Sequence, residues 1–444
     1  MEWMKNRFIN FKSKKKVIHK YFDNIDNPIE LWENDRVKNY QIDALKELVK
    51  NVYNNNEYYR AKLDKCGLTP DSEFSLDKFQ NMEFTEKKEL IQEKKLILSV
   101  PQEEISLIHL STGTTGSECI YMMYTWDDLY VNDLAPEMPI LVPSKTTDIV
   151  ANALPYEMSS SGLSFHRVIQ DSMQCAVIPV GKGGAYSEPK KTLKAIKDMN
   201  VNVLFTTPSY AMYLAQNAKE MGLKFGEDIK IDKMWITGEG CSNSFRNRIE
   251  EIWKCQALAY YGSLECGPIG IECPEKGGYH IAAGHVYVEI VDPETKKVLD
   301  PGEVGEVVVT TLLRDGMPLI RYKTQDLGYI EDIRCDCGVK LQTLYLRGRL
   351  VDQIKIDGKE YSPYYVEECL MQIPEVGNNY RFIVKEDHII IETEIKDEFA
   401  DVNKVDLEDM ISSRVEFACG IPNVVRIVEK RVYDGRKAKR VIYE

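Results

Sequence analysis

The class of fold is decided by residues 201–260, VNVLFTTPSYAMYLAQNAKEMGLKFGEDIKIDKMWITGEGCSNSFRNRIEEIWKCQALAY. Short apolar, β-branched runs alternate there with longer amphipathic segments. Strands are expected at Val203–Phe205, Lys233–Thr237 and Ala257–Tyr260, and helices at Ser209–Met221 and Ser244–Cys255. Buried parallel strands are short apolar runs, and the amphipathic helices between them cover the faces of the sheet. The stretch therefore predicts βαβ units and a parallel sheet.

The segments before this stretch are of two kinds. A strand at Cys175–Val180 and a helix at Pro189–Met199 extend the same alternation upstream. The first hundred residues instead carry apolar side chains at spacings of three and four, as at Tyr40–Asn55 and Thr85–Lys95. This spacing predicts a helical layer at the start of the chain.

After Pro268 the pattern changes to short strands separated by turn-forming residues. Strands are expected at Val286–Val291, Gly305–Leu312 and Leu319–Tyr322, which predicts an antiparallel β-subdomain. Past Arg347 a small α+β domain is expected, with strands at Gln353–Ile356, Tyr380–Val384 and His388–Thr393, and helices from Pro363 and at Val405–Phe417. A chain of 444 residues exceeds the usual size of a single core. We predict a large N-terminal α/β domain with parallel sheets and the β-subdomain, residues 1–348, and a small α+β C-terminal domain, residues 349–444.

Net charge and hydropathy exclude several classes of protein. A net charge of −13 argues against binding nucleic acid through its phosphates. The basic and aromatic N-terminus lacks the apolar core of a secretory signal, and no stretch reaches the ~18 apolar residues of a membrane span. The basic run Lys14–Lys16 is interpreted as a solvated surface patch. We expect a cytoplasmic protein, in which eleven cysteines are not expected to form a disulfide framework.

A loop rich in glycine and hydroxyl side chains follows the apolar run Ile105–Leu110. It consists of Ser111, Thr112, Gly113, Thr114, Thr115, Gly116 and Ser117. Glycines let backbone N–H groups approach an anion, and the hydroxyls add donors, so the loop suits a polyphosphate. The Gly-Lys-Ser/Thr ending of a Walker loop is missing. From composition alone, a flexible surface turn is an equal alternative.

The order of five motifs resembles the acyl-adenylate-forming superfamily. The Ser111 loop is similar to its phosphate-binding loop, and four further segments match in order: Tyr260–Glu265, Arg321–Leu327, Gly348–Pro363 and Gly435–Lys437. Within the superfamily the chain is most similar to phenylacetate–CoA ligases. The stretches that carry this second likeness are Gly162–His166, Thr207–Ala211, Glu272–Lys276 and Lys437–Val441.

The resemblance implies a function and its cofactors. It implies that ATP activates a carboxylic acid as its acyl-adenylate and that the acyl group then passes to the thiol of coenzyme A. The Ser111–Gly116 loop would hold the β- and γ-phosphates of ATP, Glu265 would hold Mg²⁺, and Asp326 with Arg349 would bind the ribose. The adenine slot would be formed by Gly238, Glu239, Gly240, Tyr260 and Tyr261, within motifs that also include Gly262 and Ser263. Each acidic residue taken alone has a surface charge or a helix cap as its alternative.

The resemblance also assigns roles in the C-terminal domain, which would be mobile. Lys437 would contact the carboxylate and the α-phosphate during adenylation, although Lys439 or Arg436 also fits the motif, and a frayed basic tail is the alternative. Lys355 would reach the site in the second step. The hinge position, commonly Asp or Lys in the family, is Val351 here, which puts the pivot in doubt.

A metal site is predicted from cysteine and histidine. Cys335 and Cys337 form a Cys-x-Cys turn, and Cys273 and His280 lie upstream. Three thiolates and one imidazole are the ligand set of a closed structural Zn²⁺ site. Cys266 and His285 are substitutes within this set, and ordinary buried cysteines without a metal are the alternative.

The sequence constrains the identity of the carboxylic acid and of the thiol acceptor less than it constrains the adenylation step. By resemblance Tyr156, His166 and Tyr210 would line an aryl or arylacetic acid pocket, with a core histidine as the alternative for His166. A carrier-protein phosphopantetheine thiol, transfer of AMP itself, and a catalytically inactive nucleotide-binding regulator remain alternatives to a CoA ligase. A homodimer is left open.

Overall fold

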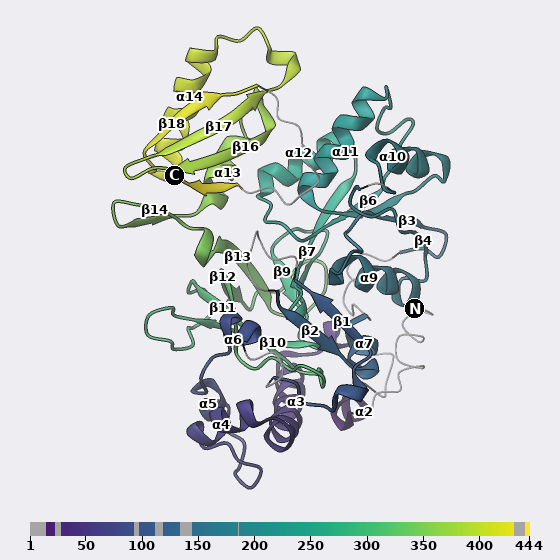
Figure 1. The fold of residues 1–444 in the computed structure, drawn as a ribbon, viewed down its shortest axis with the longest axis vertical. Helices are drawn as coiled ribbons and strands as arrows, with labels where there is room; N and C mark the ends of the chain where they lie inside the picture. The colour runs from purple at the N-terminus through teal and green to yellow at the C-terminus, as the bar shows by residue number, and fades with distance from the viewer. Residues whose placement is uncertain are drawn as a thin grey trace. The chain divides into compact units, whose positions relative to one another are not determined.

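The computed structural model describes residues 15–22, 28–92, 97–111, 119–133, 144–184, 186–429 and 440–444 (Figure 1). Contacts between Cα atoms divide the chain into two compact units. The first unit comprises residues 1–181 and 258–346, and the second unit comprises residues 182–257 and 347–444. The boundary between domains at residue 349 stays a prediction.

A helical layer begins the first unit, as the spacing of apolar residues predicts. It contains α2 (Lys16–Phe22), α3 (Asn34–Asn55), α4 (Glu57–Cys66), α5 (Leu76–Gln80) and α6 (Lys87–Gln92). In α3 the buried side chains recur every three or four residues from Tyr40 to Val52. Asn56 caps α4 by accepting a hydrogen bond from the Tyr59 amide, and the helix ends at Gly67, which holds a φ of 71°. The Tyr40 and Tyr59 hydroxyls donate to the carbonyls of Gly284 and Pro318, which anchors the layer to the β-subdomain.

The strands of the first unit form both parallel and antiparallel pairs. β1 (Leu107–Leu110) and β2 (Tyr121–Tyr124) are antiparallel, and α7 (Trp126–Asp133) follows them. β3 (Ile149–Asn152) pairs in parallel with β4 (Ala176–Ile178), and α9 (Ser160–Arg167) with a π-turn (Val168–Ser172) connects them. A second group is antiparallel: β7 (Gln256–Ser263), β8 (Gly267–Glu272), β9 (Tyr279–Ile281) and β13 (Thr343–Arg349).

The β-subdomain contains the antiparallel strands β10 (Val286–Val291), β11 (Gly305–Thr311) and β12 (Tyr322–Glu331). The predicted strand Leu319–Tyr322 is wrong, because β12 begins only at Tyr322. Arg321 holds a φ of 48°, in the left-handed region, and an extended strand cannot pass through that conformation. The side chain of Arg321 instead turns inward to the buried carboxylate of Glu289.

The second unit begins with α/β structure. β5 (Val203–Thr206) and β6 (Lys233–Ile236) are parallel, with Leu204 opposite Met234, and α11 (Pro208–Glu220) connects them. α10 (Pro189–Asp198) precedes β5, and α12 (Asn243–Trp253) follows β6. The alternation quoted from the sequence is therefore observed, and the predicted fold class, α/β followed by α+β, is confirmed.

The α+β part of the second unit begins with the hairpin β14 (Ile354–Ile356) and β15 (Lys359–Tyr361), followed by α13 (Pro363–Met371). Its four-stranded sheet has the order β18 (Asn423–Ile427), β17 (Ile389–Ile395), β16 (Val376–Val384), β19 (Val441–Tyr443). Figure 1 shows α14 (Lys404–Cys419) beside β18. The buried residues Leu407, Ile411 and Val415 lie four apart on α14 and provide its apolar face.

Buried polar groups connect α12 to α13 within the second unit. Arg248 donates to the carbonyls of Met371, Ile373, Val376 and Gly377 at distances of 2.5–3.1 Å. At the start of α12, Glu367 accepts from the Ser242 amide at 2.6 Å. Glu368 accepts from the Ser244 amide at 2.8 Å and from its hydroxyl at 2.7 Å. Carboxylates at a helix N-terminus are favourable because the first amides have no partner within the helix.

None of the helices among the described residues combines the length and the apolar character that crossing a membrane requires.

Candidate active site and metal centre

Ser111, where the predicted phosphate-binding loop begins, closes the β1–β2 hairpin together with Ile120. The Ser111 amide donates to the Ile120 carbonyl at 2.9 Å, and the Ile120 amide donates to the Ser111 hydroxyl at 2.9 Å. These two bonds hold the ends of the loop together. Thr112, Gly113, Thr114, Thr115 and Gly116 lie outside the described residues.

Two of the predicted motifs meet at Tyr261 and Asp326. Tyr261 on β7 donates its hydroxyl to the Asp326 carboxylate on β12 at 2.6 Å. Burial, the Asp326 charge and this hydrogen bond raise the pKa of Tyr261 well above its ordinary value. The phenol is therefore a neutral donor at physiological pH, and one Asp326 oxygen is held in a fixed position.

The turn after Tyr261 depends on a glycine. A Cβ added to Gly262 would lie 2.5 Å from the Gly267 carbonyl oxygen, a distance that real Cβ atoms do not reach. Ser263 accepts from the Cys266 amide at 3.0 Å and tightens the turn. Glycine therefore lets β7 and β8 approach closely where the chain turns between them.

Glu265 occupies this turn and is half-buried. Its carbonyl accepts from the Arg314 guanidinium, and the neighbouring Leu264 carbonyl accepts from the Tyr124 hydroxyl at 3.0 Å. The Glu265 carboxylate forms no hydrogen bond or ion pair with any residue in the described part of the chain. An oxygen ligand of this kind suits Mg²⁺.

The Gly238–Gly240 segment follows β6 in the second unit. Gly238 adopts a φ of 82°, which favours glycine. The Glu239 carboxylate accepts from the Ser209 hydroxyl at 2.8 Å and from the Lys182 ammonium at 3.0 Å. Burial raises the pKa of Glu239, but Lys182 and Ser209 outweigh that effect and hold it below its ordinary value. Sequence reasoning missed Lys182, although a lysine before two glycines directly after an apolar run was an available signal.

The predicted residues of the C-terminal domain lie in the second unit. Arg349 ends β13, and its carbonyl accepts from the Gln353 side chain at 2.8 Å. Lys355 on β14 is exposed and lies 2.8 Å from Glu360, whose hydrogen bond and charge raise the pKa of Lys355. Val351 is also exposed. Lys437, Lys439 and Arg436 lie outside the described residues.

Two of the three predicted acid-pocket residues lie together. The Tyr156 hydroxyl is 3.1 Å from Nδ1 of His166, and the amide of Asn152 donates to the same hydroxyl at 2.8 Å. A Cβ at Gly162 would lie 2.4 Å from the Pro155 carbonyl oxygen, so glycine is needed where α9 passes this turn. Asn152 was not predicted, because no motif signals it. Tyr210, fully buried on α11, belongs to the second unit.

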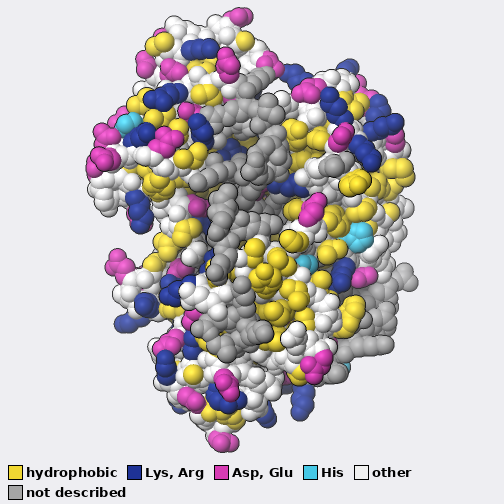
Figure 2. All heavy atoms as spheres, in the orientation of Figure 1, with side chains coloured by type: hydrophobic (Ala, Val, Ile, Leu, Met, Phe, Trp, Pro, Cys, Tyr) yellow, Lys and Arg dark blue, Asp and Glu magenta, His cyan; other side chains and the backbone are white. Residues whose placement is uncertain are grey.

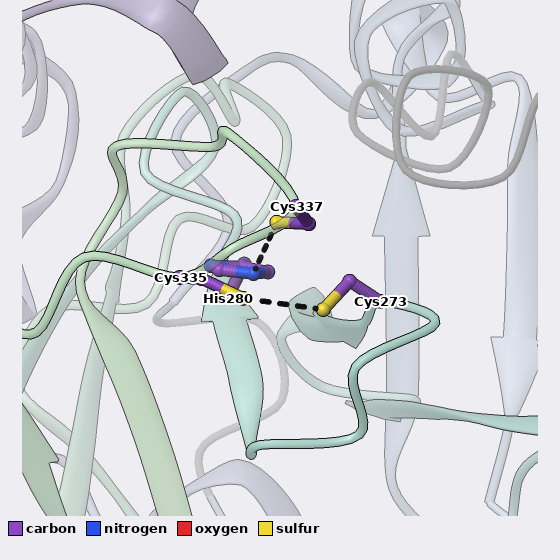
Figure 3. A group of neighbouring side chains, drawn as sticks. All are labelled: Cys273, His280, Cys335 and Cys337. Atoms are coloured by element: carbon purple, nitrogen blue, oxygen red, sulfur yellow. Dashed lines mark hydrogen bonds between the residues drawn. The ribbon is translucent and has the colours of Figure 1, made fainter.

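A second group of polar side chains lies in the first unit (Figure 3). One possible ligand atom from each of Cys273, His280, Cys335 and Cys337 lies within 4.8 Å of the others. The Sγ atoms of Cys273 and Cys335 are 3.5 Å apart, and Sγ of Cys337 is 3.3 Å from Nε2 of His280. Cys273 follows β8, His280 lies on β9, and the Cys-x-Cys turn follows β12.

The cluster is chemically suited to a soft divalent cation. Burial together with the neighbouring thiols raises the pKa of Cys337 to about 12. A bound cation reverses this effect because it favours the thiolate form. Cys266 and His285, the predicted substitutes, are not in the group that the described residues form.

The charges on the visible surface are mixed. Figure 2 shows Lys and Arg side chains interspersed with Asp and Glu among the described residues of that face.

Comparison with known proteins identifies the class. A family model described as AMP-binding enzyme matches residues 46–312, and the model of the AMP-binding enzyme C-terminal domain matches residues 358–444. The chain therefore belongs to the AMP-binding enzyme family. The predicted resemblance to acyl-adenylate-forming enzymes is confirmed.

Individual relatives narrow the class. Phenylacetate–coenzyme A ligase of Thermus thermophilus is 30% identical over 379 residues, covering 84% of each chain. Phenylacetate–coenzyme A ligase of Pseudomonas putida is 30% identical over 365 residues, covering 80% of each. The structure of 2-hydroxyisobutyryl-CoA ligase with 2-HIB-AMP superposes with a TM-score of 0.86 at 20% identity, covering 94% of this chain and 91% of the other. The phenylacetate–CoA ligase-like branch is thus confirmed as well.

Proposed function

We propose that the chain is an AMP-forming acid–CoA ligase whose substrate is an aryl or arylacetic acid. The observation that carries the proposal is the hydrogen bond between Tyr261 and Asp326, which joins two of the segments that resemble motifs of the acyl-adenylate-forming superfamily. The names of the curated relatives support both the CoA acceptor and the arylacetic acid.

The reaction has two steps. In the first, a carboxylate oxygen attacks the α-phosphorus of ATP, and pyrophosphate leaves with the electrons of the broken P–O bond. In the second, the thiolate of coenzyme A attacks the acyl carbon, and AMP leaves with the oxygen that joined it to the acyl group. The proton of the thiol passes to solvent or to a base.

Residues of the first unit act in the adenylation. The loop Ser111–Gly116 holds the phosphates, and Asp326, oriented by Tyr261, accepts from the ribose hydroxyls. Glu265 would hold Mg²⁺, which would offset the phosphate charge. The Glu265 carboxylate lies in a half-buried turn and has no partner among the described residues, which fits this role.

Residues of the second unit complete the two steps. Gly238–Gly240 contact the adenine, and the Glu239 carboxylate fixed by Lys182 and Ser209 shapes this part of the site. Arg349 binds the ribose, and Lys437 stabilises the charge that develops on the α-phosphate. Residues 349–444 act as the mobile domain, and Lys355 serves the thioester-forming step. The exposure of Lys355 leaves its ammonium accessible.

The acid lies against Tyr156 and His166 of the first unit. The Asn152–Tyr156–His166 hydrogen bonds fix these two rings. Aromatic walls with few charges suit an aryl group.

Pyrophosphate exchange tests the proposal. ATP–pyrophosphate exchange should be strongest with phenylacetate or a related aryl acid, and CoA thioester should accumulate when CoA is added. Exchange confined to fatty acids contradicts the substrate, acylation of a carrier protein in preference to CoA contradicts the acceptor, and a lack of exchange with every acid supports an inactive regulator.

We further propose that Cys273, His280, Cys335 and Cys337 hold a structural Zn²⁺. Four ligand atoms within 4.8 Å fill a tetrahedral site and leave no position for a substrate. The ion would tie the turn after β8, strand β9 and the loop after β12 together.

Metal analysis tests the zinc proposal. Protein purified without chelator should contain about one zinc per chain, and Cys335→Ser should lose it. Cys255→Ser, which changes a half-buried cysteine outside the cluster, is the matched control and should keep the metal. Equal metal content in the two variants contradicts the site.

We also propose a cytoplasmic location, which is supported by eleven cysteines that form no disulfide with one another. Sedimentation of the purified chain distinguishes a monomer from a homodimer.

A further inference from the structure

The segment between β11 and β12 carries two buried arginines with different surroundings. Arg321 is 1% exposed, and its guanidinium lies 3.1 Å from the carboxylate of Glu289, whose side chain is also 1% exposed. It also donates to the Met82 carbonyl at 2.6 Å. Arg321 is therefore a structural cation with its counter-charge inside the protein.

Arg314 is 3% exposed and forms no such ion pair with a carboxylate among the described residues. One terminal nitrogen donates to the Glu265 carbonyl, and the guanidinium lies 5.0 Å from the centre of the Tyr124 ring. Its Nε and second terminal nitrogen are buried and donate to no acceptor among the described residues.

The carboxylates of Asp315 and Asp128 are already engaged. Asp315 lies 2.5 Å from the Lys15 ammonium. Asp128 accepts from the backbone amides of Thr125, Asp315 and Gly316 at 2.6–2.9 Å. Burying a guanidinium with unused donors is costly unless an anion completes the site.

The residues around Arg314 indicate which anion completes its site. Its one hydrogen bond holds the carbonyl of Glu265, the proposed Mg²⁺ residue. The Tyr124 ring that it covers lies at the end of β2, and the Tyr124 hydroxyl holds the Leu264 carbonyl in the same turn as Glu265. Arg314 thus lies beside the turn to which the proposed function assigns Mg²⁺, the ion that would offset the charge of the ATP phosphates.

We propose that Arg314 binds an anionic phosphoryl oxygen of ATP. This inference rests on the proposed function, and it adds to it a cation that none of the recognised motifs contains. A guanidinium stays charged at every relevant pH and presents its N–H groups as a planar fork, which matches phosphate oxygens. Tyr124 is a positioning residue that supports the cation through its ring face.

Binding measurements on the full chain test the proposal. Arg314→Gln should raise the Kd for ATP by roughly tenfold or more, the loss expected for charge-assisted hydrogen bonds. The Kd for adenosine, which lacks phosphate, should not change. AMP and inorganic pyrophosphate, measured separately, identify the phosphate that Arg314 contacts: weaker AMP binding indicates the α-phosphate, and weaker pyrophosphate binding indicates the β- and γ-phosphates.

A surface arginine provides the matched control. Arg426→Gln on β18 removes the same charge from an exposed position and should leave the Kd for ATP unchanged. Unchanged ATP affinity in a folded Arg314→Gln protein overturns the proposal, as does an equal loss of adenosine binding. Wild-type protein that binds no ATP at all contradicts the proposed function instead.

A crystal structure keeps the proposal testable if Arg314→Gln fails to fold. In wild-type protein with a non-hydrolysable ATP analogue, a guanidinium nitrogen should lie about 3 Å from a phosphoryl oxygen. A guanidinium that contacts no phosphate in that complex overturns the proposal.

Discussion

The turn Tyr261–Glu265 and the contact between α12 and α13 use buried polar groups in opposite ways. At the helix contact, Arg248 donates to four carbonyls, and Glu367 and Glu368 accept from the start of α12. At the turn, the Glu265 carboxylate and two nitrogens of Arg314 have no partner among the described residues. A region whose polar groups are all paired serves stability, whereas unused polar groups in a well-ordered turn indicate a ligand.

The largest expected effect is the loss of adenylation activity when a residue of the turn Tyr261–Glu265 is changed. Glu265→Gln removes the charge that would hold Mg²⁺ and should lower kcat of adenylation by roughly a hundredfold or more. Because the carboxylate supports no contact within the described residues, the free energy of unfolding should change little.

Steady-state pyrophosphate exchange across a Mg²⁺ titration, with urea unfolding beside it, measures both effects. A large loss of stability, with an unchanged dependence of exchange on Mg²⁺, would show that Glu265 is structural. The turn and the helix contact would then both serve stability.

At the contact between α12 and α13 the expectation is reversed: a substitution should lower stability and leave ATP binding unchanged. Arg248→Ala leaves several carbonyls without donors and should lower the free energy of unfolding by about 3 kcal/mol. The Kd for ATP should stay near that of the wild type in the folded fraction.

Urea unfolding measures the stability, and calorimetric titration measures ATP binding. Lys224→Ala, which removes an exposed basic side chain from the same unit, is the control and should unfold like the wild type. Loss of ATP affinity without loss of stability would reverse the interpretation of this region.

The smallest expected effect is on stability, and it comes from the hydrogen bond between Tyr261 and Asp326. Tyr261→Phe removes one hydrogen bond and should cost about 1 kcal/mol of stability near neutral pH. The pKa of Tyr261 is raised on folding, so the folded state keeps its proton at a pH where the unfolded state loses it. Stability is therefore fully present below the unfolded pKa and falls as pH rises above it.

Urea unfolding between neutral pH and pH 11 measures this slope. The loss of stability in alkali should be shallower in Tyr261→Phe than in the wild type. Identical slopes would show that folding does not raise the pKa of Tyr261.

The sequence predicted some of the residues that distinguish the turn from the helix contact and missed others. The motifs that contain Tyr261, Glu265 and Asp326 were recognised, because each is a short run of specific residues. The four metal-site candidates were predicted from residue type, and the structure brings them together. Arg314 and Tyr124 were missed, because each acts on a segment far from it in the chain and has no motif of its own. Lys182 was missed although the two glycines that follow it were an available signal.

The error at Leu319–Tyr322 has a similar cause. The run is apolar and β-branched, so local propensity favours a strand. Arg321 instead takes a φ of 48° and extends its side chain to Glu289 on a neighbouring strand. The buried ion pair outweighs local preference, and it depends on a residue more than thirty positions earlier in the chain.

The sequence by itself determined the alternation of strands and helices, the order of the motifs and the family, because periodicity and short motifs are local properties of the chain. Only the tertiary structure decided which buried charges are paired and which are left open. Pairing depends on segments that folding brings together from distant positions, and no local pattern records the distance between Arg314 and the turn that carries Glu265.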